Sequence, residues 1–515
     1  MRDIRLALMP LAVLLVSCGG GGGSSAPGNS GTPVVPPPPL SLRGVAIGSA
    51  AVVPVAVGTG VTLGTLDAAT MKTLIDSSVV FGSAFTGTPT CAITTYTLKY
   101  HTIDAVGADT DASTAIMVPS GSNPACQGNR PVLMYAHGTS ARKSADMADL
   151  SSTEPRLVAA MFAAQGYIVV APNYAGYAGS SLGYHAYLDA EQQAGDMIDA
   201  LRAARTAFGG IGASASSRLM ITGYSQGGFV AMATQRAMQT QARYASEFSV
   251  TAAAPLSGPY ALLQFGDAIF NGAPTVGSSG FMPMLINAGQ RAGAAIYTST
   301  SDVYEAKYAS GIDTLLPGAL SLGDLVDAGK LPDDVLFAQD SLPQVAGYGS
   351  FFGADHLIKT GYRNTYLADL RAQPCNASNA APLSCAPAQP LRKWLLKNDL
   401  RTYTPAVPLL LCGGDADPLV PYANTVAASA YFRAQNINPA LLAVLNLDDA
   451  ALTGDFRTTR VEFAAAKALL RQATLQTGGS GAAADQAVKD AYHAGLVAPF
   501  CLRETRKFFD SAPSR

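Results

Sequence analysis

The segment ITGYSQGGFV constrains the fold most, because Gly223-Tyr224-Ser225-Gln226-Gly227 stands between two regular patterns. Residues 218–222 have the apolar character of a buried strand, and residues 228–239 have the spacing of an amphipathic helix. A serine on such a turn needs a strained backbone, and its glycine neighbours let strand and helix approach each other. In a chain with 51 glycines roughly 0.4 chance matches to Gly-x-Ser-x-Gly are expected. The strand–turn–helix context, more than the motif, therefore predicts Ser225 as a nucleophile.

Strands and helices alternate on both sides of this turn. Residues 131–136 are predicted as the first core strand and residues 167–172 as the next, with helices over residues 154–164 and 187–208. Alternation at these lengths predicts an α/β fold with a mainly parallel sheet flanked by helices. Because the chain shows no internal repeat and no second linker, we expect one large domain from residue 41 to residue 515.

A nucleophilic serine needs a general base and an acid that orients the base, and in this arrangement the acid precedes the histidine. Five histidines occur, and His493 is the one near the C-terminus; its rival His356 precedes every good acid candidate. The apolar residues 407–412 predict a strand, and the loop after it contains Asp415 and Asp417. The position of Asp417 shortly before a valine–proline pair favours it as the acid, with Asp415 as the alternative.

The loop His137-Gly138-Thr139 is the candidate oxyanion hole, the set of backbone N–H groups that binds a developing negative charge. It directly follows a predicted strand, and Gly138 allows the backbone to turn close to Ser225. We expect the N–H of Thr139 to be one donor and the N–H of Gln226 to be the other. His137 is expected to be structural rather than a proton carrier.

The first forty residues have the composition of an export signal and a tether. Arg2 and Arg5 precede an apolar run that is too short to span a membrane, so residues 1–17 are predicted to be a signal peptide. The run ends in Leu-Val-Ser-Cys, which resembles a bacterial lipobox and implies lipidation of Cys18; a plain secretory signal is the alternative. Glycine, serine and proline dominate residues 18–40, as in a tether. We expect a lipid anchor at Cys18 in the bacterial cell envelope, or else secretion.

Six cysteines remain besides Cys18, and in an exported chain an even number favours disulfides. The expected pairs are Cys91–Cys126, Cys375–Cys385 and Cys412–Cys501. The first two pairs are neighbours in sequence. Metal binding is the weaker alternative, because no Cys-x-x-Cys or His-x-x-x-His spacing occurs. A net charge of −2 without a basic run argues against nucleic acid as a partner.

Four motifs in this order resemble the α/β-hydrolase superfamily: His137-Gly138-Thr139, Gly223-Tyr224-Ser225-Gln226-Gly227-Gly228, Gly414-x-x-Asp417-x-x-Val420-Pro421 and His493. Two further stretches resemble the secretory lipases of the fungal lipase A type and their bacterial relatives: Tyr184-His185-Ala186-Tyr187-Leu188 and Ala253-Ala254-Pro255-Leu256-Ser257-Gly258-Pro259-Tyr260. The resemblance implies an α/β-hydrolase fold and a serine esterase or lipase that forms an acyl-enzyme on Ser225, with no cofactor and no metal. It also implies a helical lid or cap, here residues 261–403, over a site for a small-molecule or lipid ester.

One region departs from the family pattern. The histidine usually follows the last strand closely, whereas here His493 comes more than roughly forty residues after the expected last strand at residues 441–447. A helical pattern at residues 461–473 and a glycine-rich stretch at residues 478–484 fill the interval. A Cys412–Cys501 disulfide would join the acid loop to the histidine segment across this insertion, which is the reason to prefer that pairing.

Three other functions use or imitate the same fold. A peptidase of the prolyl-oligopeptidase type shares the sheet and the triad, but its β-propeller does not fit into the about ninety residues ahead of the expected first core strand. An acyltransferase would use the same triad and deliver the acyl group to an alcohol, and nothing in the sequence excludes it. A non-enzymatic binding protein on this fold would typically lack a triad member, whereas all three positions are filled here.

Overall fold

The structure is a computed structural model that describes residues 42–58, 60–78, 82–375, 378–451 and 453–513. Leu42–Arg515 forms one compact unit. The predicted signal peptide, the tether and Cys18 lie outside the described residues. Within the described ranges, no helix combines the length and the apolar character needed to cross a bilayer.

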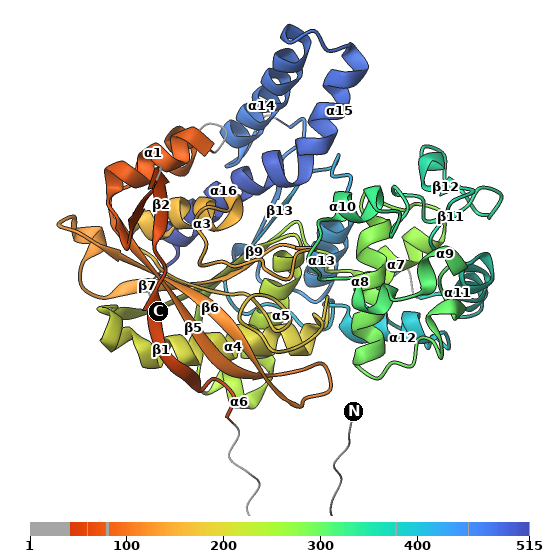
Figure 1. The fold of residues 1–515 in the computed structure, drawn as a ribbon, viewed down its shortest axis with the longest axis horizontal. Helices are drawn as coiled ribbons and strands as arrows, with labels where there is room; N and C mark the ends of the chain where they lie inside the picture. The colour runs from red at the N-terminus through yellow and green to blue at the C-terminus, as the bar shows by residue number, and fades with distance from the viewer. Residues whose placement is uncertain (1–41, 59, 79–81, 376–377, 452, 514–515) are drawn as a thin grey trace, which may run out of the picture. The chain divides into compact units, whose positions relative to one another are not determined.

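A ten-stranded sheet runs through this unit (Figure 1), in the order β1-β5-β6-β8-β7-β9-β10-β13-β14 with β4 paired to β5. The strands are Ala46–Val52 (β1), Thr65–Leu66 (β4), Ala92–Ile103 (β5), Asp109–Ser120 (β6), Arg130–Ala136 (β7), Ile168–Pro172 (β8), Ala215–Tyr224 (β9), Val250–Leu256 (β10), Leu409–Gly413 (β13) and Leu442–Asn446 (β14). Neighbours from β8 through β14 pair in parallel, whereas β1, β4, β5 and β6 pair antiparallel. The mainly parallel α/β sheet predicted from the sequence is therefore confirmed.

Helices cover both faces of the sheet, and the two faces bury separate cores. In β7, Val132 and Met134 belong to the core under α4 and α5, while Leu133 and Tyr135 belong to the core under α3 and α16. This alternation follows from the two-residue period of a strand. The covering helices are Ala68–Ser78 (α1), Gly82–Thr86 (α2), Thr153–Met161 (α3), Ala190–Ala207 (α4), Gln226–Thr240 (α5), Ala242–Ala245 (α6), Ala423–Ala434 (α13) and Ala498–Ser511 (α16).

The predicted helix over residues 187–208 begins later than expected. Asp189 has an extended backbone, and its side chain accepts hydrogen bonds from the N–H groups of Glu191 and Gln192. Aspartate in this position satisfies the first free N–H groups of a helix. Tyr187 and Leu188, which precede this cap, line the same pocket as Ser225.

The strand predicted at residues 131–136 is confirmed as β7, but it is not the first strand of the core, because β1, β4, β5 and β6 precede it in the same sheet. The long strands β5 and β6 pair along their whole length, from Ala92–Ser120 to Ile103–Asp109. Side chains along β5 alternate between buried and half-buried positions, and threonine is frequent in it. A search for continuous apolar runs detects buried parallel strands and overlooks a half-buried antiparallel strand of this kind.

Residues 261–403, here called the cap segment, lie between β10 and β13, and helices joined by long irregular stretches form them. The cap segment contains Leu262–Phe270 (α7), Ser278–Arg291 (α8), Ala306–Ala309 (α9), Leu322–Asp327 (α10), Thr360–Ala372 (α11) and Pro390–Asn398 (α12), with the short pair Phe337–Ala338 (β11) and Phe352–Gly353 (β12). Its helices gather beside the sheet on the right of Figure 1. A buried arginine, Arg392, fixes α12 to α7 and α11 through Asp267 at 2.9 Å and Asp369 at 2.7 Å.

The interval between β14 and His493 is a helical hairpin. Arg457–Gln476 (α14) and Gly481–Ala491 (α15) lie side by side at the top of Figure 1. A π-helical turn, Tyr492–Val497, carries His493 and leads directly into α16. π-helical turns inside longer helices occur frequently at functional sites.

Candidate active site

Ser225 lies on the sharp turn between β9 and α5. Its backbone has φ 59° and ψ −121°, a conformation that residues other than glycine adopt only under strain. Its N–H donates to the carbonyl oxygen of Leu256 on β10 at 3.0 Å, which holds the turn in place. The side chain is partly exposed, whereas the residues on either side of it are buried. Strain of this kind is typical of the nucleophile turn in hydrolases.

Three glycines around Ser225 are required by close backbone contacts. A Cβ atom on Gly227 would lie 1.9 Å from the carbonyl oxygen of Ala136, and one on Gly228 would lie 2.2 Å from that of Leu256. A Cβ atom on Gly223 would lie 2.4 Å from the carbonyl oxygen of Gly227. The helix can begin this close to β7 and β10 only because these positions have no side chain.

The structure brings the predicted base and acid together. His493 Nδ1 lies 2.7 Å from Oδ2 of Asp417, and both residues are buried, at 5% and 6% exposed. The other oxygen of Asp417 accepts from the N–H groups of Leu419 and Val420 at 3.0 and 3.1 Å. Asp417 is thus fixed by its own turn and can hold the histidine ring with its Nδ1 proton toward the carboxylate.

Asp415, the alternative acid, points elsewhere. Its side chain is exposed and accepts from the amide of Asn446 at 2.7 Å. His356, the rival histidine, lies in the cap segment and pairs with Glu305 at 3.2 Å. The geometry thus favours Asp417 and His493 over both alternatives.

His493 Nε2 is buried and has no hydrogen-bond partner within the described part of the chain, so its bond to Ser225 Oγ is not formed here. The phenol of Tyr224, the residue before Ser225, donates to the carbonyl oxygen of His493, and the two rings lie 4.8 Å apart. Tyr224 therefore ties the histidine segment to the turn. Catalytic hydrogen bonds often tighten only when a substrate binds.

Thr139 and Gln226 line the same pocket as Ser225. Gly138 does not offer its own N–H to this pocket, because that group donates to Oε1 of Glu154 at 2.9 Å. The same carboxylate oxygen accepts from the hydroxyl of Tyr135 at 2.8 Å. Glu154 therefore anchors the loop from α3. The expected need for glycine at position 138 does not appear in the structure, because a Cβ atom there would lie 3.7 Å from the Glu154 carboxylate and from the carbonyl oxygen of Tyr224, which are ordinary contacts.

Aromatic side chains hold the rest of this loop. Tyr174 donates to the carbonyl oxygen of His137 at 3.1 Å, and Tyr177 donates to that of Ser140 at 2.7 Å. The ring of His137 stacks on Tyr174 with centroids 4.2 Å apart, and its Nε2 lies 3.1 Å from the carbonyl oxygen of Asn173. His137 is a packing residue in this arrangement, as the sequence indicates. The loop is therefore held in place before any ligand arrives.

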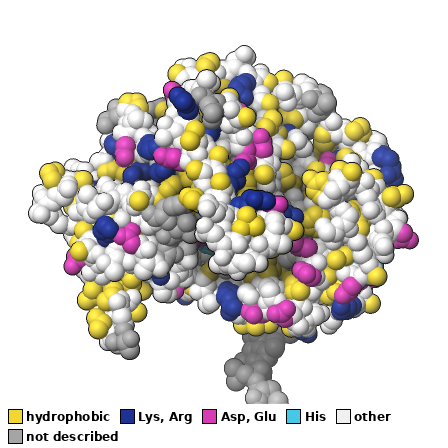
Figure 2. Space-filling model, turned by 90° about the horizontal axis from the view of Figure 1, so that it is seen from above, with side chains coloured by type: hydrophobic (Ala, Val, Ile, Leu, Met, Phe, Trp, Pro, Cys, Tyr) yellow, Lys and Arg dark blue, Asp and Glu magenta, His cyan; other side chains and the backbone are white. Residues whose placement is uncertain are grey.

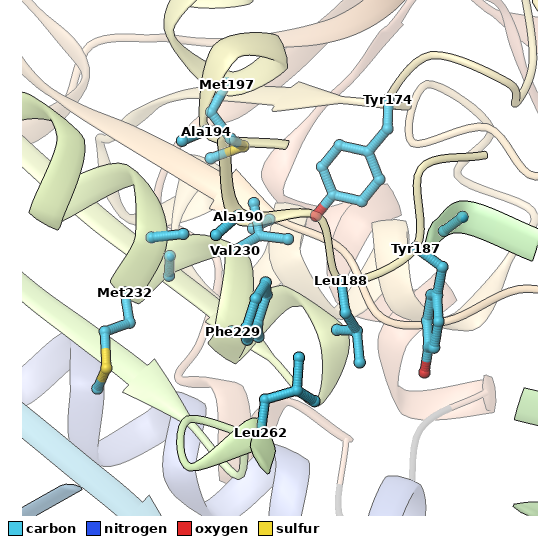
Figure 3. Packing of buried hydrophobic residues seen from close by; sticks show 14 of the residues in the cluster. Tyr174, Tyr187, Leu188, Ala190, Ala194, Met197, Phe229, Val230, Met232 and Leu262 are labelled. Atoms are coloured by element: carbon cyan, nitrogen blue, oxygen red, sulfur yellow. The ribbon is translucent and has the colours of Figure 1, made fainter. Parts of the chain in front are cut away.

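An apolar pocket of about 60 Å³ opens beside Ser225 and runs between the sheet and the cap segment. Its lining is formed by Thr139, Tyr187, Leu188, Ser225, Gln226, Pro259, Leu262, Phe265, Gly266, Ile269, Phe270, Thr275, Ser278, Phe281, Met282, Leu285, Leu391, Leu395, Leu419 and Val420. Figure 3 shows Tyr187, Leu188 and Leu262 near one another, where α7 approaches the segment that precedes α4. Such a lining suits an aliphatic group and offers few hydrogen bonds to a polar one.

Six cysteines form three disulfides in the structure: Cys91–Cys126, Cys375–Cys385 and Cys412–Cys501. These are the pairs expected from the sequence. Disulfides form and persist in oxidising compartments, which indicates an exported protein. Among the described residues, no group of three or more histidine, cysteine, aspartate or glutamate side chains is arranged to hold a metal ion.

Sequence reasoning missed three contributors to the site: Glu154, Tyr224 as a tie to the histidine, and His185 as a partner of Gln226. Glu154 and Tyr224 act through contacts between elements that are far apart in the chain. His185 lies in Tyr184-His185-Ala186-Tyr187-Leu188, a stretch that resembles the secretory lipases but has no spacing that marks a catalytic or positioning role. Its burial, at 2% exposed, and its contact with Gln226 at 2.7 Å could not be read from the sequence.

The model of the secretory lipase family matches residues 144–290 of this chain. No curated protein sequence matches it. Among solved structures, the rice cell wall degrading esterase LipA from Xanthomonas oryzae is similar with a TM-score of 0.67 at 24% identity, over 92% of this chain and 100% of that chain. A protein from Legionella pneumophila has a TM-score of 0.62 at 18% identity, over 90% of this chain and 97% of that one.

Candida antarctica lipase A is less similar, with a TM-score of 0.46 at 15% identity over 78% of this chain and 76% of that chain. The sheet order, the strained turn and the matches to LipA and to the secretory lipase family agree with one another. Together they support an exported carboxylic-ester hydrolase with the α/β-hydrolase fold, similar to the secretory lipases.

Proposed function

We propose that the protein hydrolyses carboxylic esters through an acyl-enzyme on Ser225, with His493 as general base and Asp417 as the acid. The observation that carries the proposal is the strained turn at Ser225, which opens into an apolar pocket beside two candidate oxyanion donors. The buried Asp417–His493 pair, 2.7 Å apart, supports it. A serine on a nucleophile turn and a histidine oriented by an acid are the parts that acyl transfer by a serine requires.

In the proposed reaction, Ser225 Oγ attacks the ester carbonyl carbon while His493 Nε2 takes its proton. The carbonyl oxygen becomes an oxyanion between the N–H groups of Thr139 and Gln226, and the N-terminus of α5 favours that charge. The protonated His493 then gives its proton to the leaving alcohol. Water repeats the sequence on the acyl-enzyme, releases the carboxylic acid and restores Ser225.

The pocket indicates the kind of ester. Leucine, isoleucine, phenylalanine and methionine side chains from α7, α8 and α12 make up nine of its twenty lining residues. We infer that this pocket receives an aliphatic chain of the substrate, because apolar burial favours such a chain by about 0.8 kcal/mol per methylene. Positive and negative side chains are scattered among uncharged ones over the face shown in Figure 2.

The test is hydrolysis of p-nitrophenyl esters of increasing acyl length by the wild type, Ser225→Ala and Ser217→Ala. Ser217 is an exposed serine at the opposite end of β9 and serves as the matched control. We expect turnover by the wild type and by Ser217→Ala, and a loss of at least about 10³-fold in Ser225→Ala. Failure of the wild type to hydrolyse any of these esters would contradict the proposal. Added short alcohols would reveal acyl transfer if ester products outweigh the free acid.

We also propose that the mature chain begins at a lipidated Cys18. The lipobox-like sequence around it supports this, as does the glycine- and proline-rich stretch that follows. Incorporation of labelled palmitate in the producing cell, with Cys18→Ser as control, tests the anchor. Release of unlabelled, active wild-type protein into the medium would favour a plain secretory signal instead.

A further inference from the structure

Gln226, which follows Ser225, is joined to a buried histidine that the proposed reaction does not use. The Gln226 side chain is 1% exposed, and its amide nitrogen lies 2.7 Å from Nε2 of His185. On the other side of the ring, His185 Nδ1 lies 3.1 Å from the carbonyl oxygen of Ala175. Because a carbonyl oxygen can only accept, Nδ1 carries the proton and Nε2 accepts from the Gln226 amide.

The surroundings of His185 keep it in this state. Burial lowers the pKa of His185 to about 3, so the ring is neutral at any pH used to assay an ester. The amide nitrogen of Gln193 also approaches Nε2, at 3.1 Å, while its oxygen accepts from the N–H of Leu188. Gln226 is therefore bound to a fixed acceptor, in a setting that neither solvent nor protonation disturbs.

The same histidine ring contacts the side chains that hold the opposite half of the proposed oxyanion hole. Its centroid lies 5.6 Å from that of Tyr174 and 4.7 Å from that of Tyr177. These tyrosines donate to the carbonyl oxygens of His137 and Ser140, on either side of Thr139. His185 thus lies between the two supports of the oxyanion hole.

We propose that His185 is a positioning residue that sets the distance between the two oxyanion donors. Through Gln226 it fixes the N–H that follows Ser225, and through the tyrosines it supports the loop that carries Thr139. The inference rests on the proposed ester hydrolysis. His185 touches no reacting atom, so its effect should appear in the transition state, where the oxyanion forms, rather than in ground-state binding.

The test compares His185→Ala, Gln226→Ala and the double variant with the wild type on p-nitrophenyl butyrate. We expect each single variant to lower kcat by about 10-fold or more, short of the roughly 10²–10³-fold loss when a donor is removed outright. KM should change by less than about 3-fold, because ground-state contacts remain. The double variant should lose little more than the stronger single variant, since both remove the same hydrogen bond.

A trifluoromethyl ketone of the same chain length provides a second readout. Ser225 Oγ adds to its carbonyl carbon, the serine proton passes to His493, and the ketone oxygen becomes the oxyanion. Its affinity should fall in parallel with kcat/KM, whereas a merely structural role would leave the two unrelated. Gln226→Ala decides the case if His185→Ala does not fold, because it removes the same contact from the other side.

Gln235→Ala is the matched control, since Gln235 lies on α5, is 1% exposed and bonds to Gln239 instead of a histidine. An equal loss in this control, an additive double variant, or a change confined to KM would overturn the inference. If the wild type is active and the variants are unaffected, the inference about His185 fails and the proposed function stands. An inactive wild type would overturn the proposed function and the inference with it.

Discussion

Cys501, near the start of α16, is disulfide-bonded to Cys412 at the end of β13, with the two Cα atoms 5.7 Å apart. The bond joins the strand before Asp417 to the helix after His493. It closes a loop of 89 residues, whereas Cys375–Cys385 closes one of 10. The hairpin of α14 and α15 thus projects from a base that is closed covalently.

Removal of the Cys412–Cys501 bond should therefore destabilise the protein more than removal of Cys375–Cys385. Loop entropy gives up to about 4.7 kcal/mol for a loop of roughly 100 residues and less for a short one. We expect a lower unfolding temperature for the double alanine variant at Cys412 and Cys501, and a smaller change for the pair at Cys375 and Cys385. Thermal unfolding measures both. Equal shifts in unfolding temperature would contradict the larger contribution expected of Cys412–Cys501.

Substitution of Asp415 and of Asp417, which lie on the loop after β13, should have very different effects on kcat. Asp417→Asn keeps the shape of the side chain but removes the charge that orients His493, which in comparable triads costs about 10⁴-fold in kcat. Asp415→Asn changes an exposed group that contacts Asn446 and should keep activity within about 2-fold of wild type. Steady-state kinetics of both variants on one ester decides between them. The reverse ranking would make Asp415 the acid.

Gly227→Ala should impair folding, because the new methyl group would lie 1.9 Å from the carbonyl oxygen of Ala136. Overpacking of this kind costs typically about 1–3 kcal/mol and sometimes more. Gly209→Ala is the control, since a Cβ atom there meets nothing within 4 Å. Urea unfolding of the two variants compares the costs. An equal free energy of unfolding for Gly227→Ala and Gly209→Ala would contradict the close contact between Gly227 and Ala136.

Asp196 should make stability depend on pH. Burial raises its pKa to about 7, and one of its oxygens has no partner in the described part of the chain. An acid with a raised folded-state pKa stabilises the fold below its unfolded pKa of about 4, and this stability is lost as pH rises through about 7. Asp196→Asn should therefore raise the unfolding temperature relative to wild type clearly more at pH 9 than at pH 5. Equal effects at both pH values would exclude Asp196 as the source.

Asp448 should support both halves of the acid–histidine pair. Its carboxylate accepts from the N–H of Ala416 at 3.1 Å, from the hydroxyl of Tyr492, which precedes His493, and from Lys467 on α14. We expect Asp448→Ala to lower kcat about 10-fold and to cost about 1–3 kcal/mol, since the buried hydroxyl of Tyr492 loses its acceptor. Asp449→Ala, which removes a half-exposed pair with Arg460, should cost under about 1 kcal/mol. Kinetics and unfolding of both variants test this.

Much of the fold could be predicted from the sequence because its central strands are continuous apolar runs. Residues 167–172 and 407–412 were expected as strands, and they correspond to β8 and β13. The sequence does not predict the antiparallel β5 and β6 in the same way. β5 is half-buried and rich in threonine, and β6, although buried over residues 112–119, mixes serine and threonine with its apolar residues. A search for continuous apolar runs therefore finds the central parallel strands more reliably than these antiparallel ones.

The candidate site was only partly readable. Motifs selected Ser225, Asp417 and His493 because glycine, proline and the scarcity of histidine leave few alternatives. No local signal showed that Glu154 holds Gly138 or that His185 holds Gln226. Such contacts join segments 16 and 41 residues apart, and they follow from the packing of the sheet rather than from any spacing.

Two different parts of the chain form the pocket beside Ser225. Residues proposed for the chemistry all lie outside the cap segment, whereas most of the apolar wall comes from α7, α8 and α12 within it. A substitution in the wall can therefore alter which esters fit without touching the proton relay. Selection or engineering can vary much of the substrate range separately from reactivity, since the cap segment is one continuous insertion and the residues proposed for the chemistry lie before and after it.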